Sequence, residues 1–352
     1  MTSPPLYATD DNSALEMLHD LGCTDGLPVV VPTPERVERM VIASGLDADI
    51  AVGSIGPLHG SATIEKIAAN AVMAGCLPDH LPVLLAAVRA VCRPELDTSE
   101  WQSTTHAISP LVIVHGEAAT SSGVVGGFGA LGPGHRANAS IGRALRLVLI
   151  NIGGARPGVS DMALLGHPGK FTMCLAEDAT TGLGALCGEA AVTVVGTEGP
   201  HSVLSVGDAD DSAAPGRLLD SLAASVANVG SNNAYFRRGS VAIALNPDHA
   251  AALHAAGLRL ASIATAVCER AVNRRGTLRS LNPTFAGSGG DDDLIRAVAD
   301  PKDVLVFVAG GPGLYSMVFP SWGAGPHANP WVREQVVLDQ SCEMPPATAN
   351  WR

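Results

Sequence analysis

The chain has 352 residues, of which 47% are hydrophobic and 4% aromatic, so it can form one large or two medium domains with a substantial core. The formal net charge is −12 and no block of basic residues occurs, which argues against a nucleic-acid partner. No apolar run reaches the roughly 18 residues of a membrane span, and the start lacks the pattern of a signal peptide. We therefore expect a cytoplasmic protein with no membrane partner.

The first half begins with alternating helical and extended patterns. Residues 1–12 form a polar tail in this interpretation, followed by a helix that stops at Gly22. Residues 27–31 are apolar and predict a strand. Thr33 is then a plausible N-cap for a helix over 35–43 that begins after a proline.

The second half repeats this order. Residues 241–245 predict a strand, Asn246 a helix cap, and a helix follows as far as Ala256. In both halves a further helix comes next, over 64–75 near Cys76 and over 260–272 with Cys268. The apolar strands show no alternation with polar residues, which predicts sheets that are covered on both faces. The pattern therefore predicts an α/β fold with mixed or parallel sheets covered by helices.

Two glycine-rich loops, 126–138 and 322–329, share an order of residues. Each reads aromatic-Gly-Ala, then Gly-Pro, His and Ala-Asn, with three residues fewer in the second copy. Each follows an apolar run, 111–114 or 304–308. We expect two pseudo-symmetric half-units that present matching loops to one cleft. Short similarities of this kind also arise by chance, because α/β proteins reuse strand–turn–helix units.

The predicted half-units are residues 13–190 and 191–352, and 286–293 are expected to form a flexible surface loop. The chain carries seven cysteines with no Cys-x-x-Cys pair, which favours reduced thiols. Helices rich in glycine and alanine are compatible with a homodimer.

The first glycine-rich loop leads into a helix predicted over 139–150. Backbone N–H groups at a helix start attract anions, and Arg136 and Arg143 add positive charge there. Asn138 either caps this helix or contacts a ligand. We predict a carboxylate or phosphate site here, to which His327 and Asn329 of the second loop would contribute. A capped helix with two surface arginines is the alternative.

Further polar groups occur where strands meet loops, the usual place for sites in α/β enzymes. These groups are His106, Asp161, His167, Lys170, Cys174, Glu177, Glu198 and His201. Lys170 could hold a substrate carboxylate. His106, His167 and His201 with Glu198 are candidate ligands of a divalent metal, although none of them has the tight spacing of a known motif. Hydrogen-bonded loop histidines are the alternative.

Two cysteines are candidate nucleophiles if no metal is present. Cys76 follows an apolar helix and Cys174 follows the His-Pro-Gly-Lys segment. Activation would need a neighbouring histidine or a helix dipole, and a buried inert thiol is the alternative. Asn70 lies between apolar residues of the same helix as Cys76, so it bonds a neighbouring loop or meets a ligand.

Four segments together resemble a widespread bacterial family that is grouped with the UGSC (seleno)proteins. They are residues 25–30, 70–76, 136–144 and 166–170. The Cys-Gly-Ser-Cys type of motif after which that group is named is absent, so the resemblance does not support thiol or selenol redox chemistry. It implies a bacterial, enzyme-like protein.

These patterns favour an enzyme that hydrolyses or eliminates a group from a small polar or anionic metabolite. His106, His167 or His201 would act as general acid or base, because imidazole titrates near neutral pH. Arg136, Asn138 and Lys170 would hold the anion. The alternatives are a non-catalytic anion-binding subunit and an oxidoreductase with a bound metal or flavin, for which no flavin signal is present.

Overall fold

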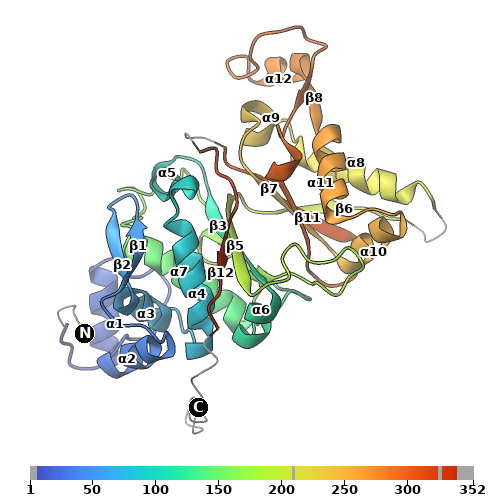
Figure 1. The fold of residues 1–352 in the computed structure, drawn as a ribbon. Helices are drawn as coiled ribbons and strands as arrows, with labels where there is room; N and C mark the ends of the chain where they lie inside the picture. The colour runs from blue at the N-terminus through green and yellow to red at the C-terminus, as the bar shows by residue number, and fades with distance from the viewer. Residues whose placement is uncertain (1–5, 208–210, 324–326, 339–352) are drawn as a thin grey trace.

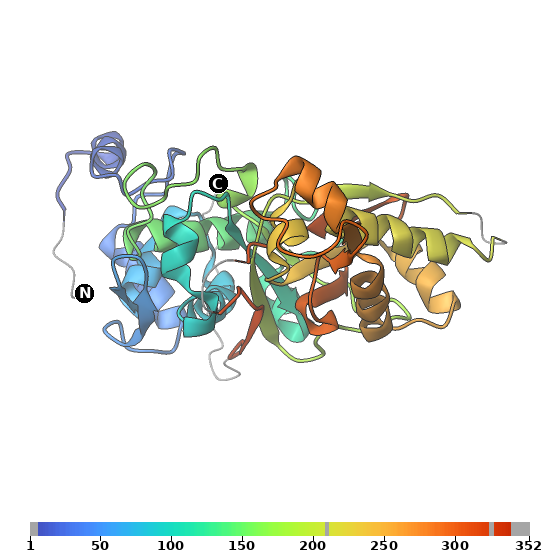
Figure 2. The same cartoon turned by 90° about the horizontal axis from the view of Figure 1, so that it is seen from above.

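The computed structural model describes residues 6–207, 211–323 and 327–338. They form two four-stranded sheets that pack face to face, and helices cover the outer face of each sheet. Figure 2 shows these layers from left to right as helices, two central sheets and helices again. The predicted α/β class with mixed, helix-covered sheets is thereby confirmed.

The first sheet has the strand order β12-β5-β3-β4. Strand β3 (Ser109–His115) runs parallel to β4 (Cys174–Ala176) and antiparallel to β5 (Ala191–Thr197), and β12 (Val332–Gln335) pairs antiparallel with β5. Every residue of β3 and β5 is buried, as expected for strands covered on both faces.

The second sheet has the order β10-β7-β11-β6. Strand β7 (Val241–Leu245) runs parallel to β10 (Val304–Val308) and antiparallel to β11 (Tyr315–Phe319), which pairs antiparallel with β6 (His201–Leu204). Read from β6 to β10, neighbouring strands are antiparallel, antiparallel and parallel. The first sheet shows the same succession when it is read from β12 to β4. This agreement does not test the predicted duplication, which stays a prediction.

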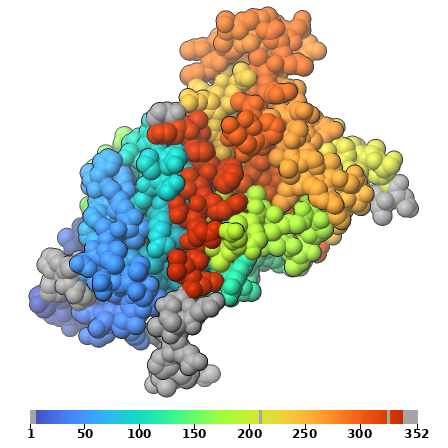
Figure 3. All heavy atoms as spheres, in the orientation of Figure 1, coloured from blue at the N-terminus to red at the C-terminus, as the bar shows by residue number. Residues whose placement is uncertain are grey.

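The chain crosses between the sheets twice, because β5 leads into β6 and β11 leads into β12. The crossings meet at a bridge between Thr197 and Ser321. In Figure 3 the C-terminal segment, in red, runs down the front between the two halves. The predicted boundary after residue 190 consequently does not separate the sheets, since β5 and β12 both belong to the first one.

Three apolar clusters fill the layers. Alternate β3 side chains such as Val112 pack under helices, whereas Leu111 and Ile113 face the second sheet. Phe307 of β10 and Phe319 of β11 meet them there, which makes the middle cluster the contact between the sheets. The third cluster lies between the second sheet and its own helices.

The described residues form twelve helices: α1 Asp11–Asp20, α2 Pro34–Ala43, α3 Ile64–Met73, α4 Leu81–Val91, α5 Thr98–Ser103, α6 Gly116–Ser122, α7 Arg136–Asn151, α8 Ala214–Val226, α9 Asn232–Phe236, α10 Pro247–Ala255, α11 Leu260–Arg270 and α12 Arg275–Leu281. Two antiparallel pairs complete the described strands: the hairpin of β1 Ala51–Ile55 with β2 Gly60–Thr63, and β8 Val272–Arg274 with β9 Leu294–Arg296, which α12 separates in the chain. Figure 1 shows α1 to α3 at one end and α12 at the other.

Local sequence signals explain several of these ends. Thr33 and Asn246 cap α2 and α10 through their side-chain oxygens, as predicted. The predicted strand over 27–31 is wrong: this segment belongs to none of the strands in the described residues, and its one backbone bond to a distant element runs from Val30 N–H to Met73 O. Helix α1 starts at Asp11, inside the predicted tail, and buries no residue.

In the part of the chain that the structure describes, no single helix has the length and apolar character needed to cross a membrane. Helices α10 and α11 meet these criteria only when taken together, and they are bent by 92° relative to each other.

Candidate functional site

The two glycine-rich loops lie at opposite ends of the strands. Gly126 O accepts a bond from Gly310 N, just beyond the end of β10, whereas Asn329 O accepts one from Ser240 N, just before β7 begins. Strands β7 and β10 are parallel. The prediction that both loops face one cleft is therefore wrong. Residues 324–326 of the second loop lie outside the described residues, and His327 is exposed.

The three asparagines predicted to bind substrate hold the framework together. Asn138 accepts a bond from Val125 N and donates to Val125 O and Ala130 O, so it fixes the glycine-rich loop. Asn329 donates to the carbonyl of Gly196. Asn70 donates to a carbonyl of its own helix and accepts from the Asn151 amide of α7. Buried amides need such partners, so a structural role explains them.

The arginines near the start of α7 are already occupied by protein acceptors. Arg136 donates twice to the Gly75 carbonyl. Arg143 forms a two-pronged ion pair with Asp25, with N–O distances of 2.7 and 2.8 Å. The structure therefore supports the alternative interpretation of these residues, a capped helix with arginines bonded to the protein.

The candidate nucleophiles Cys76 and Cys174 are both buried. Burial raises the pKa of Cys174 to about 12 and the pKa of Cys76 further above its ordinary value. Both thiols therefore stay protonated at neutral pH, and a thiol is a poor nucleophile compared with a thiolate. Packing is the role that their surroundings support.

The proposed metal ligands do not gather. His106 Nε2 lies 2.9 Å from Glu198 Oε1, but His201 is an exposed residue of β6 in the second sheet. Within residues 6–207, 211–323 and 327–338, no group of three or more His, Cys, Asp and Glu side chains has a geometry that could hold a metal ion. The geometry thus gives the metal hypothesis no support.

A cavity of about 830 Å³ does bring several predicted residues together. It lies between the loop at 22–26, the C-terminal half of α7 and the segment 155–171. Asp161, His167 and Lys170 all line it, together with Asp25 and a residue that the sequence analysis missed, Arg146. Cavities of a few hundred to about 1,000 Å³ are typical of small-molecule sites.

Arg146 is the most unusual group in this cavity. Its side chain projects from α7 and is only 5% exposed. Nε donates to the Lys170 carbonyl at 2.6 Å and Nη1 donates to Gln102 Oε1 at 3.1 Å, but Nη2 is buried and has no partner among the described residues. Burial lowers the pKa of Arg146 to about 10, so the guanidinium remains charged at neutral pH. A buried donor without a partner is costly, and a ligand would relieve that cost.

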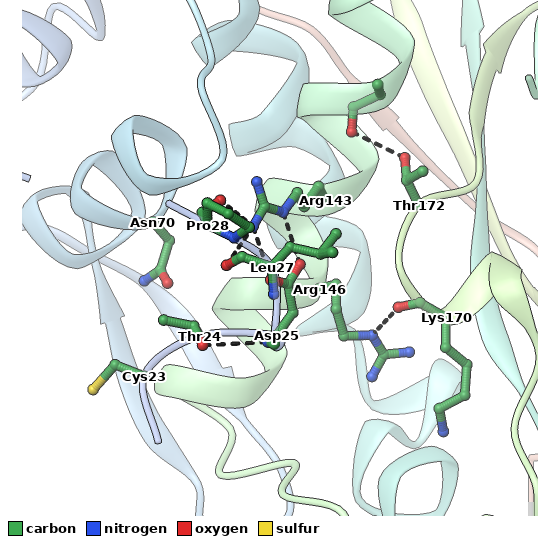
Figure 4. A network of polar contacts seen from close by, with 12 residues as sticks. Cys23, Thr24, Asp25, Leu27, Pro28, Asn70, Arg143, Arg146, Lys170 and Thr172 are labelled. Carbon is green, nitrogen blue, oxygen red and sulfur yellow. Dashed lines mark hydrogen bonds and ion pairs between the residues drawn. The ribbon is translucent and has the colours of Figure 1, made fainter. Parts of the chain in front are cut away.

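Lys170 lies next to Arg146 and is balanced by Asp161. Its Nζ is 2.7 Å from one Asp161 oxygen and 2.9 Å from the other. Figure 4 shows the Arg146 guanidinium between α7 and Lys170, with the Lys170 ammonium directed to the same side. Burial and the neighbouring guanidinium lower the pKa of Lys170. Arg146 therefore carries the charge that the cavity leaves uncompensated.

His167 has a defined proton position. Its Nδ1 accepts a hydrogen bond from Gly169 N at 3.1 Å, so a neutral ring carries its proton on Nε2, which lies 3.3 Å from Ser109 Oγ. Burial, with the charges of Lys170 and Arg146, lowers the pKa of His167 and keeps the ring neutral at pH 7. The ring therefore acts as a hydrogen-bond donor and does not activate Ser109.

The His106–Glu198 pair lies beside this cavity rather than in its lining. Glu198 acts electrostatically on His167, and Leu164 N–H of the cavity segment donates to Thr105 O, next to His106. His106 Nε2 bonds Glu198, while His106 Nδ1 is buried and finds no partner in the part of the chain that the structure describes. A carboxylate that holds Nε2–H leaves the Nδ1 lone pair free, which is the arrangement of an oriented base.

The sequence contained a signal for Arg146. It stands between Leu145 and Leu147 in the C-terminal half of α7, where the other buried residues are apolar. A search of protein-family models found no match to this chain, and a search of curated proteins found none either, so the resemblance of its four segments to a bacterial family stays a prediction.

Proposed function

We propose that the protein is an enzyme that cleaves a small anionic metabolite, by hydrolysis or elimination, in the cavity beside α7. The observation that carries this proposal is the buried, charged Arg146 with a free Nη2. A chain with a net charge of −12 that nonetheless keeps an uncompensated cation in a cavity has a local preference for anions.

The surrounding residues have separate roles in this proposal. Arg146 and Lys170 bind the anionic group, because both are cationic side chains that line the same cavity. His167 donates a hydrogen bond from Nε2–H to a negative charge that develops on the substrate and keeps its proton, which requires it to exchange Ser109 for substrate. The His106–Glu198 pair is the candidate base.

A non-catalytic anion-binding protein is the second candidate, favoured by one observation. Both ring nitrogens of His167 are engaged by protein groups, Gly169 and Ser109, so the ring has a structural role even without a substrate. The two functions share the anion site and differ in whether turnover occurs.

The test begins with binding. A panel of small carboxylates and phosphates is screened by thermal shift against the wild type and an Arg146→Met/Gln102→Leu variant, which removes the buried donor and its partner together. Specific ligands stabilise the wild type by about 2.7 kcal/mol at a hundredfold excess over Kd and leave the variant unchanged.

Ligands that pass are incubated with the enzyme in D₂O and followed by proton NMR for cleavage or deuterium uptake. The enzyme proposal predicts turnover that His167→Gln abolishes while binding persists. Binding without turnover in the wild type would favour the binding protein. If the Arg146 variant bound the ligands as tightly as the wild type, neither the enzyme nor the anion-binding protein would have a basis.

A further inference from the structure

The segment that carries the cavity residues also places apolar side chains in water. Leu164 is 85% exposed and Leu165 is 96% exposed, and Val159 and Phe171 are exposed as well. Single exposed leucines are common, but a group of them around a cavity mouth indicates a binding surface. Leu165 and Phe171 themselves line the cavity.

This segment is held in place by bonds that do not involve its apolar side chains. Leu164 N–H donates to Thr105 O, and Gly158 N–H donates to Asp161 O in a turn. The Lys170–Asp161 ion pair ties its two ends together. The exposed side chains are thus presented by a braced loop, and long loops without regular structure are commonly functional.

The charges deeper in the cavity limit the ligand to one negative charge. Asp161 balances Lys170 and Arg143 balances Asp25. Arg156 is at the surface and donates to the Leu21 carbonyl. One buried cation with one free nitrogen therefore remains among the described groups, and a single carboxylate matches it better than a phosphate dianion with three charged oxygens.

We infer that the cavity binds an amphipathic monocarboxylate, with its carboxylate on Arg146 and Lys170 and its apolar body along Ile150, Phe171 and Leu165. This inference rests on the proposed anion site and adds the substrate class. The cavity has the volume for both parts, about 830 Å³.

The test is isothermal titration calorimetry with straight-chain acids, from acetate through butanoate and hexanoate to octanoate, below their micellar concentrations. Affinity should rise about fourfold for each added methylene, the fold-change that corresponds to about 0.8 kcal/mol per buried CH₂. Hexanol, which lacks the charge, and hexanedioate, which has a second one, should each bind at least tenfold more weakly than hexanoate.

Two leucine variants test where the apolar body of the ligand binds. Leu165→Ser should reduce the gain per methylene while leaving acetate affinity unchanged, because the carboxylate site is intact. Leu294→Ser is the matched control: it replaces a leucine that is 65% exposed in β9, far along the chain from the cavity. It should behave as the wild type.

The outcomes separate this inference from the proposed function. Acids of all lengths that bind equally, and only when Arg146 is present, would overturn the amphipathic ligand and leave the anion site standing. Binding of phosphate or hexanedioate in preference to hexanoate would overturn it in the same way. Failure of every anion to bind would remove both proposals. A dimer in sedimentation that Leu165→Ser dissociates, together with no chain-length effect, would reassign the exposed leucines to self-association.

Discussion

The two sheets share their strand order and directions, yet the two halves differ in what they bury. Within the described ranges, the buried Asp, Glu, Lys and Arg side chains all belong to the first half: Glu65, Arg146 and Asp161, together with Asp25 and Glu177, whose side chains are 3% and 2% exposed. The helices over the second sheet bury residues such as Leu222, Ile263 and Val267. Since buried charge costs stability, the first half carries a cost that the second half avoids.

The helix that follows each central strand makes the same point locally. His115 ends β3 before α6, and Asn246 follows β7 before α10. Asn246 performs a standard cap, while His115 is buried in a network with Glu177 and Thr193. The cap in the second half also belongs to a buried network, because Ser316 Oγ bonds both Asn246 N–H and the ring of His249, but the hydrogen-bond partners in that network include no carboxylate.

The largest expected effect comes from breaking the network of His115 and Glu177. Glu177→Ala should lower the free energy of unfolding by about 3–5 kcal/mol, because it leaves His115 and the N–H groups of Leu186 and Cys187 without their acceptor. Asn246→Ala in the other half should cost only about 1 kcal/mol. Urea unfolding measures both, and equal losses would contradict the contrast between the halves.

Removing the buried charge should separate binding from stability. Arg146→Met alone leaves Gln102 Oε1 unpaired and should destabilise the protein by about 1–3 kcal/mol. Arg146→Met/Gln102→Leu should stay within about 1 kcal/mol of the wild type, since both partners become apolar, yet lose hexanoate binding. Chemical unfolding measures the stability of these variants, and calorimetry on the same samples measures their affinity for hexanoate. A double variant that still bound hexanoate would exclude Arg146 as the anion site.

Neutralising Asp161, the acid beside Lys170, should strengthen ligand binding, whereas removing Arg146 should weaken it. Asp161→Asn leaves Lys170 uncompensated and should raise affinity for a monoanion about tenfold at low salt, because two like charges then face the ligand. The gain should shrink as KCl increases. Calorimetry at two KCl concentrations tests this, and weaker binding would mean that Asp161 mainly positions the loop.

The most gradual effect is the pH dependence of stability, which develops over several pH units. Burial lowers the pKa of His80 to about 4 and also lowers the pKa of His167 and His249. Below pH 6.5 the unfolded chain therefore takes up protons that the folded state does not, so stability falls as pH decreases. The slope should be at most about 1.4 kcal/mol per pH unit for each histidine.

Melting temperatures between pH 7 and pH 4.5 report this slope. His80→Gln in the first half and His249→Gln in the second should each reduce it, whatever their constant effect on stability at pH 7. An unchanged slope in either variant would assign the acid sensitivity to other groups.

The sequence predicted the fold class because the central strands are apolar throughout, and it predicted the caps of α2 and α10 from local chemistry. It could not show that β5 and β12 join one sheet, since that pairing is decided by tertiary contacts. His167, Lys170 and Asp161 were found as polar groups in a loop after a long helix. Asn138 was misassigned because an amide that holds a loop and one that holds a ligand look alike in sequence.

Anomalous diffraction from crystals grown in bromide tests the central claim most directly. We predict a bromide ion in the cavity, within hydrogen-bonding distance of Arg146 Nη2 and on the side to which Lys170 points. A cavity without an anomalous peak, with Nη2 bonded to a protein carbonyl, would contradict the anion site and the function built on it.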